Sequence, residues 1–171
     1  MPRIVIIGNA GAGKSTLARQ LAAKRGLQHV EIDKLLWQPG WVRTPDEEYE
    51  RKHNEAVSGD GWIIDGLGRK ASFAKRLARA TEVILVDMPL WMHFWLAAER
   101  QLAWTRGELE HTPGGIAAMP STRALFKAIW EVDRTWMPEI RALCMDAERQ
   151  GKPVMRLQSV EDLTRAAGAL V

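Results

Sequence analysis

The sequence has few residues of several kinds, and each shortage excludes a class of protein. Its 171 residues include one cysteine, Cys144, which excludes a disulfide framework within the chain and any multi-cysteine metal or iron–sulfur site. The four histidines are dispersed, without the short spacing of zinc ligands. The N-terminal apolar run covers only residues 4–7, about half the length of a secretory signal core and about a fifth of a membrane helix. These features are typical of a soluble cytoplasmic protein.

Neither sign of charge dominates the sequence. There are 24 Lys and Arg residues against 21 Asp and Glu, which leaves a net charge of +3. That excess is too small to indicate nucleic acid by itself, and it fits a small anionic substrate equally well. The basic residues cluster between Gly66 and Thr81, and we interpret most of this cluster as a solvated helix face. With 46% apolar residues and no polar linker, residues 1–171 are expected to form a single domain.

Short apolar runs alternate with helical stretches along the chain. Runs of β-branched residues without a polar face are typical of parallel strands that are buried on both sides. We predict three such strands, at 3–7, 62–64 and 83–86, and two further strands, one ending near 32 and one at 154–157. We predict helices at 14–25, 46–57, 90–106 and 121–150, and a last one after 159. Thr44 is expected to cap the second helix, and Pro138 to kink or divide the fourth.

The strongest motif follows the first predicted strand. The segment Gly8-Asn9-Ala10-Gly11-Ala12-Gly13-Lys14-Ser15 satisfies the P-loop pattern G-x-x-x-x-G-K-[ST] and opens an amphipathic helix. Glycines let backbone N–H groups wrap a polyphosphate, and the helix N-terminus adds unpaired donors and a favourable dipole. We predict that this loop and Thr16 bind ATP. Within it, Lys14 is expected to contact the β and γ phosphates during catalysis, and Ser15 to ligate magnesium.

Other nucleotide-binding classes lack support in the sequence. The glycines do not follow the G-x-G-x-x-G pattern of dinucleotide-binding proteins. No N-K-x-D segment of guanine-specific GTPases is present, and the chain is short for a motor ATPase. A small-molecule phosphotransferase remains. Its expected fold is the α/β, three-layer P-loop NTPase fold, with a five-stranded parallel sheet and helices on both faces.

Carboxylates follow three of the predicted strands. Asp33, Asp65 and Asp87 each come directly after a predicted strand. Because the carboxyl ends of parallel strands meet at one edge of a sheet, we expect these side chains to lie near the P-loop. A nucleotide-bound magnesium keeps several waters, which one or two carboxylates orient. We predict that Asp65, with Asp33 beside it, joins Ser15 at the metal, whereas Asp87 caps the next helix.

Further segments resemble known kinases. Asp65-Gly66-Leu67-Gly68-Arg69 resembles the D-G-F-P-R segment of adenylate kinases and related nucleoside monophosphate kinases. The chain as a whole is more similar to the bacterial DNA topology modulation proteins, an adenylate-kinase-like group. This similarity rests on Asp33-x-Leu35-x-Trp37-x-Pro39-Gly40-Trp41, Trp62-Ile63-Ile64-Asp65-Gly66, and Ile129-Trp130 before Arg134. It implies a nucleoside monophosphate kinase-like fold with an acceptor-binding segment at about 34–61 and a short lid at about 107–120.

Phosphoryl transfer requires charge compensation, so cationic side chains are expected around the lid. Arg100 and Arg106 precede the lid; a predicted helical stripe after it carries Arg123, Lys127, Arg134 and Arg141. We predict catalytic roles for Arg100, Arg106, Arg123 and Arg134. For the residues after the lid, the alternative is a solvated face paired with neighbouring acids. Arg69 is the candidate for binding an acceptor phosphate.

Eight tryptophans accompany a single tyrosine. Trp37 and Trp41 lie in a Pro/Gly-containing loop where the resemblance places the acceptor site, and we predict that they stack on a base. The alternative is burial in a small cluster with neighbouring leucines. Trp91 and Trp95 share one face of their helix, and this spacing predicts core packing.

Two kinds of acceptor fit these residues. A phosphate acceptor is already ionised and needs no general base, and Trp37, Trp41 and Arg69 favour a nucleoside monophosphate. A hydroxyl acceptor, as in shikimate- or gluconate-type kinases, needs a carboxylate base, for which Asp33 is the candidate.

We therefore predict an ATP-dependent kinase that uses ATP and Mg²⁺ and phosphorylates a small nucleotide or metabolite. The alternative class is a nucleotide-binding regulator that influences DNA topology with little kinase activity, as the resemblance to the topology modulation proteins suggests. The sequence has no helix-turn-helix pattern, zinc finger or basic arm, so direct recognition of duplex DNA is not expected. No membrane partner is expected, and the sequence specifies no oligomeric state.

Overall fold

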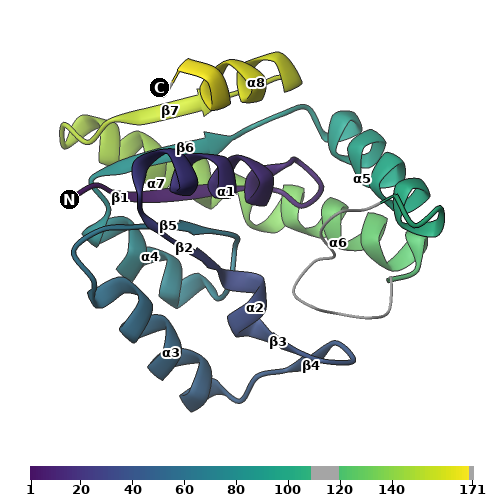
Figure 1. Cartoon of the computed structure of the whole chain (residues 1–171), viewed down its shortest axis with the longest axis horizontal. Helices are drawn as coiled ribbons and strands as arrows, with labels where there is room; N and C mark the ends of the chain where they lie inside the picture. The colour runs from purple at the N-terminus through teal and green to yellow at the C-terminus, as the bar shows by residue number, and fades with distance from the viewer. Residues whose placement is uncertain (109–119, 170–171) are drawn as a thin grey trace.

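The sheet brings five strands that are distant in sequence into one parallel layer. The computed structural model describes residues 1–108 and 120–169. Its main sheet has the order β2-β5-β1-β6-β7, and every neighbouring pair is parallel (Figure 1). The strands are β1 (Arg3–Gly8), β2 (Gln28–Glu31), β5 (Trp62–Asp65), β6 (Glu82–Val86) and β7 (Val154–Leu157). The predicted α/β architecture is confirmed.

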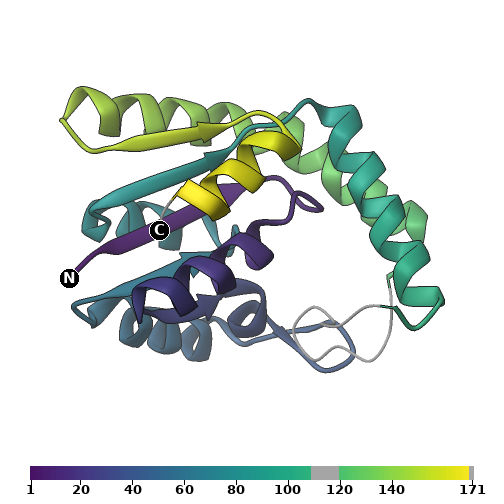
Figure 2. The same cartoon turned by 45° about the horizontal axis from the view of Figure 1, so that its top comes forward.

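Helices cover both faces of this sheet (Figures 1 and 2). One face packs against α1 (Lys14–Arg25) and α8 (Val160–Ala169). The other packs against α3 (Asp46–Ser58), α4 (Lys70–Arg79) and α7 (Met137–Arg149). The helices α5 (Leu90–Thr105) and α6 (Thr122–Thr135) contact each other beyond the carboxyl ends of the strands.

Strand β1 shows why its sequence is an unbroken apolar run. Ile4 and Ile6 pack into the core under α1 and α8, while Val5 and Ile7 pack into the core on the opposite face. All four side chains are fully buried. A strand in the middle of a parallel sheet has no solvent-facing side, so alternation of polar and apolar residues is lost.

Some local elements differ from the predictions. The predicted loop after β2 forms a short helix, α2 (Ile32–Leu36), and a hairpin of β3 (Trp37–Gln38) and β4 (Val42–Arg43). The Thr44 cap is wrong: Pro45 is the N-cap of α3, and the buried Thr44 donates its backbone N–H to Leu36 O. The long helix divides at Trp136, and Pro138 lies in the first turn of α7, where its missing N–H costs nothing.

The basic segment after β5 contains a buried arginine. Arg76 on α4 is fully buried and donates to Gly66 O at 3.0 Å and to Leu67 O at 2.6 Å. Burial lowers the pKa of its guanidinium to about 10. The solvated-face interpretation is therefore wrong for Arg76, which fixes the loop that leads from Asp65 to α4.

The prediction of buried tryptophans on α5 is also wrong. Trp91 and Trp95 are exposed rather than packed in the core. The side of α5 that faces the protein carries His93, Ala97 and Gln101. The prediction failed because both sides of this helix are apolar at helical spacing, so the pattern did not identify the buried side.

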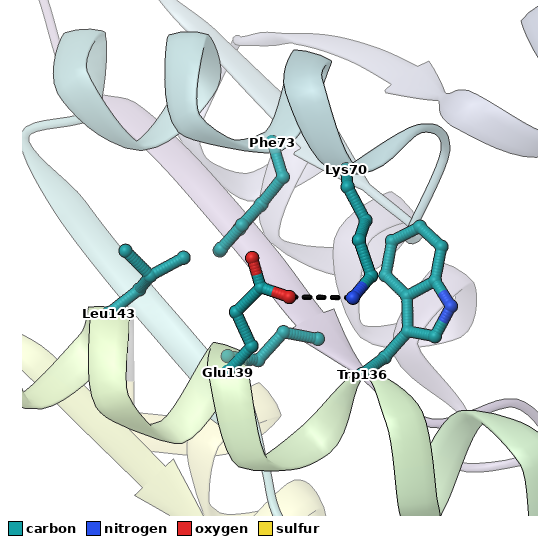
Figure 3. Close-up of a pocket in the computed structure, with 6 residues that line it drawn as sticks. Lys70, Phe73, Trp136, Glu139 and Leu143 are labelled. Atoms are coloured by element: carbon teal, nitrogen blue, oxygen red, sulfur yellow. Dashed lines mark hydrogen bonds and ion pairs between the residues drawn. The ribbon is translucent and has the colours of Figure 1, made fainter.

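Figure 3 shows a pocket between α4 and α7 that an ion pair crosses. Lys70 Nζ lies 2.7 Å from Glu139 Oε2 and 5.4 Å from the centroid of the Trp136 ring. Phe73 and Leu143 complete its apolar wall. The lining residues all come from α4, α7 and the residue before it, so this pocket is a packing feature of the helical layer. In the described ranges, no helix combines the length and hydropathy needed to cross a bilayer.

Gly68 supplies a test of how tightly the loop after β5 is packed. It has a left-handed φ of 66°, and a Cβ there would lie 2.3 Å from Tyr49 Oη and 2.6 Å from Ile32 Cγ2. We expect Gly68→Ala to lower the free energy of unfolding by about 3 kcal/mol, of which about 1 is backbone strain and the rest steric. Urea denaturation measures the loss.

The matched control is Gly26→Ala. Gly26 has a similar φ of 62°, but no atom lies within 4 Å of the added Cβ. This variant is expected to lose only about 1 kcal/mol, the cost of the left-handed backbone. Equal losses in the two variants would show that the space around Gly68 is not restrictive.

Candidate active site

The P-loop joins the central strand β1 to α1, where it is enclosed by its neighbours in the sheet. Gly8 ends β1 beside Val86 of β6. A Cβ on Gly8 would lie 2.2 Å from Val86 O, so only glycine lets the chain leave the sheet at this point. The loop then delivers Lys14 and Ser15 to the first turn of α1, near the carboxyl ends of the strands. This is the location predicted for the ATP-binding segment.

Two helices that are distant in sequence hold the start of the P-loop. The side chain of Asn9 is fully buried, donates to Ile129 O of α6 at 2.8 Å, and accepts from the Ala10 N–H at 2.7 Å. His93 Nδ1 on α5 lies 2.9 Å from Ala10 O, which can only accept, so His93 donates. Burial lowers the pKa of His93, which disfavours its charged form. These contacts fix the loop's shape within the protein.

Ser15, Asp65 and His29 form a chain of hydrogen bonds next to the loop. Ser15 Oγ donates to Asp65 Oδ2 at 2.6 Å, and His29 Nε2 lies 2.7 Å from Asp65 Oδ1. Asp65 is 2% exposed, so these partners satisfy a carboxylate that water hardly reaches. The structure thus brings together the predicted metal-binding residues Ser15 and Asp65.

Asp33, Lys14 and Arg100 form the charged part of the site. Asp33 lies in the first turn of α2, and its Oδ1 is 3.7 Å from the place a Cβ on Gly66 would occupy. Its side chain reaches solvent, yet protein surrounds it enough to raise its pKa, and nearby Asp65 adds to this while Lys14 and Arg100 oppose it.

Burial and the nearby carboxylates also shift the pKa values of Lys14 and Arg100. Lys14 Nζ donates to Asn9 O at 2.6 Å. Burial lowers the pKa of Lys14, while the charges of Asp33 and Asp65 oppose that shift. Burial also lowers the pKa of Arg100, and Asp33 again opposes it. The two predicted cations and the two carboxylates therefore lie within electrostatic reach of one another.

Arg69 lies in a socket between α3 and α4. Its Nη2 donates to Thr44 O at 3.1 Å, and its Nη1 forms an ion pair with Asp46. Its guanidinium stands 4.8 Å from the centroid of the Tyr49 ring, and its buried Nε has no partner among the described residues. Groups of α3 and of Thr44 ahead of it therefore already bind most of this guanidinium.

The hairpin that follows α2 carries the two tryptophans predicted to bind the acceptor. The rings of Trp37 and Trp41 meet edge to face, with centroids 5.8 Å apart, and the Arg43 guanidinium carbon lies 5.8 Å from the Trp37 ring. Trp41 has an unusual positive φ of 60° in the turn between the strands. Trp37 also packs against the main core, as in the cluster alternative.

The remaining predicted cations lie on α5 and α6. Arg106 follows the end of α5, Arg123 lies in the first turn of α6, and Arg134, in its last turn, stacks 5.5 Å from the Trp130 ring. All three are exposed, and in residues 1–108 and 120–169 none forms an ion pair. Residues 109–119 of the predicted lid lie outside the described residues.

Asp87 and Arg141 form an ion pair that the sequence did not indicate. Arg141 Nη2 lies 2.8 Å from Asp87 Oδ1, so Arg141 is not free for the predicted cationic stripe. Asp87 does not cap α5, because the N-cap is Pro89 and no side chain bonds there.

His29 and His93 are site residues that the sequence reasoning missed. Each is a polar residue in an otherwise apolar setting, His29 on a strand of the buried sheet and His93 on an apolar helix. Such an isolated polar residue signals a specific hydrogen-bond partner when the element is buried. The partner itself depends on strand order and helix packing, which the sequence does not reveal.

Comparison with known proteins agrees with this geometry. A family model described as an AAA domain matches residues 4–106, more than half of the chain. Shikimate kinase of Sulfurihydrogenibium sp. (strain YO3AOP1) is 30% identical over 104 residues, which cover 53% of this chain and 63% of that protein. The match therefore spans less than two thirds of this relative's length.

Solved structures share the fold. Shikimate kinase from Acinetobacter baumannii in complex with shikimate has a TM-score of 0.62 at 15% identity, covering 99% of this chain and 91% of the other. A gluconokinase from Sinorhizobium meliloti 1021 has a TM-score of 0.53 at 14% identity, with the same coverage of both chains. The three-layer P-loop fold expected from the sequence is confirmed, and the chain belongs to the AAA domain family.

Proposed function

We propose that the protein is an ATP-dependent kinase that phosphorylates a hydroxyl group of a small metabolite. The observation that carries this proposal is the position of Asp33, a carboxylate next to the P-loop within electrostatic reach of Lys14 and Arg100. A hydroxyl acceptor needs such a base. The similarity to a shikimate kinase, a member of a hydroxyl-phosphorylating class, supports the same choice.

The residues of the P-loop edge fit Mg²⁺ and ATP. The loop's geometry excludes a Cβ at Gly8, as a backbone cradle requires, and Ser15 and Asp65 supply the hydroxyl and carboxylate that such a metal uses. Gly11 and Gly13 also have positive φ values, 81° and 71°. When bound, Mg²⁺ would neutralise phosphate charge and orient the transferring group. His29 holds the second oxygen of Asp65 and so keeps the first directed at Ser15.

In the proposed reaction, an oxygen of the acceptor attacks the γ-phosphorus of ATP as the bond to the β,γ-bridging oxygen breaks. Asp33 accepts the proton that the hydroxyl loses, and ADP leaves with the bridging oxygen. Lys14 and Arg100 offset the negative charge on the phosphoryl oxygens. Burial raises the pKa of Asp33, which makes it a stronger base than an ordinary aspartate once it is ionised.

The socket of Arg69 bears on the choice of acceptor. Arg69 is already bound to Asp46 and Thr44 O, so an acceptor phosphate would have to compete with these partners. This competition favours a hydroxyl acceptor over a nucleoside monophosphate. The second candidate remains a nucleoside monophosphate, because the Trp37–Trp41 hairpin offers aromatic surface beside Asp33 for a base.

The narrower resemblance to the DNA topology modulation proteins stays a prediction. It rests on the segment from Asp33 to Trp41, part of which folds as the aromatic hairpin. A regulatory role would require that the protein act through nucleotide binding at the P-loop rather than through phosphoryl transfer. A screen that measures ADP release with hydroxyl metabolites and nucleoside monophosphates separates the two roles.

The donor site is tested with Lys14→Ala. We expect this variant to fold and to lose kcat/KM for ATP by about a hundredfold to a thousandfold, because no other side chain supplies its charge within the P-loop. The control is Lys24→Ala, which removes a lysine from the far end of α1 and should keep full turnover. Steady-state ADP release measures both, and turnover retained in Lys14→Ala would exclude the P-loop as donor site.

The base is tested with Asp33→Asn. With a hydroxyl acceptor we expect kcat to fall by about a hundredfold or more, while KM for ATP changes little. In the wild type, kcat/KM should fall as pH decreases through the raised pKa of Asp33, because protonation removes the base. If kcat in Asp33→Asn stays within tenfold for every acceptor, the hydroxyl-acceptor assignment is wrong.

A further inference from the structure

Helix α5 is apolar on two opposite sides, and the described chain covers only one of them. His93 and Ala97 face the protein and are buried. Trp91, Trp95 and Leu102 are 64%, 62% and 56% exposed. Their spacing of four and seven residues places them on one side of the helix. We call these three residues the outer stripe.

The composition of α5 is that of a helix covered all round. Only two of its 16 residues are charged, Glu99 and Arg100. The charge of Arg100 interacts with Lys14 and Asp33 at the P-loop, on the inner side of the helix. Exposed helices in soluble proteins normally carry a polar outer face, whereas a helix that is apolar all round is buried in its working assembly.

The exposed area matches what an interface needs. An aromatic side chain buries about 150–250 Å² when fully covered, so Trp91 and Trp95 together present on the order of 300 Å². Leu102 adds about 100 Å². A standard interface buries about 800 Å² per partner, of which roughly 57% is apolar, or about 450 Å². The outer stripe thus supplies most of the apolar area of one side of such an interface.

We propose that the outer stripe is the interface of a homodimer, in which α5 packs antiparallel against α5 of a second copy. A two-fold axis near Ala98 places Trp95 opposite Leu102 of the partner subunit, and Leu102 opposite the partner's Trp95. The small side chain of Ala98 allows the helix axes to approach to about 8–10 Å. A C2 interface requires such self-complementarity, with each residue and its counterpart exchanging roles.

The same register pairs the ends of the stripe. Counted from the axis, Trp91 falls opposite Arg106 of the partner subunit, an exposed guanidinium just beyond the end of α5. An arginine over an indole face adds a cation–π contact. The helix thus provides both halves of each pairing from its own sequence, which favours a second copy over an unrelated protein.

A membrane surface is a poorer occupant of this stripe. Helices that bind in the headgroup region flank their apolar side with several lysines or arginines. Within α5 the single basic residue is Arg100, whose charge acts on Lys14 and Asp33. The neighbouring α6 packs on α5 through Phe94 and Phe126, whose ring centroids are 4.9 Å apart. This contact holds the helix that carries the outer stripe in place.

Sedimentation velocity across a concentration series from about 1 to 100 µM tests the proposal. We expect the wild type to shift from the 19.2 kDa monomer to a species of twice that mass. Trp95→Asp should raise the dissociation constant at least thirtyfold, as for an interface hot spot. Because Trp95 is exposed, this variant should keep the wild-type thermal midpoint at concentrations where the wild type is monomeric.

Two further variants make the test specific to α5. Met145→Asp replaces an exposed apolar residue of α7 and should leave the dimer unchanged. Ala98→Cys should form an intermolecular disulfide under mild oxidation, whereas Met145→Cys should not; the native Cys144 is buried and should not react. A wild type that stays monomeric at the highest concentration overturns the proposal, and so does a dimer that persists in Trp95→Asp.

Discussion

The P-loop keeps its shape because two helices that follow it by more than 80 residues bind its first turn. Asn9 reaches the backbone of α6, and His93 reaches back from α5 to Ala10 O. The Asn9 bond is buried and the His93 bond partly buried, so losing either would leave a polar group poorly satisfied inside the protein. The arrangement of the P-loop at the sheet edge therefore depends on the packing of α5 and α6, and the loop is not an independent local motif.

Charge organises the rest of the site. Lys14 and Arg100 lie within electrostatic reach of Asp33 at an edge that solvent partly reaches. Burial lowers the pKa of both cations and raises that of Asp33, and the opposite charges of the site counteract these shifts. The chain of Ser15, Asp65 and His29 fixes one carboxylate, while Asp33 is held next to Gly66 without a hydrogen bond to either cation among the described residues. One acid is thus restrained and the other is available for chemistry.

Much of this architecture follows from local pattern. The strands β1, β5 and β6 could be predicted because a strand buried on both faces is apolar along its length. The P-loop could be predicted from its motif, and the position of Asp65 beside it because parallel strands end at one edge. Tertiary contacts decided the rest. Arg76 sits in a basic run that looks solvated, and α5 offers two apolar sides, so neither burial could be assigned without knowing the packing. The roles of His29 and His93 likewise depend on partners from other elements.

Arg76 has a consequence for the segment that follows Asp65. Its guanidinium donates to the carbonyl groups of Gly66 and Leu67 and, among the described residues, forms no ion pair with a carboxylate. The carbonyl of Gly66 is buried, so without this guanidinium it would lose its donor where water cannot easily replace it. Removal of one side chain on α4 would therefore loosen the turn beside Asp65 while the strands of the sheet keep their own hydrogen bonds.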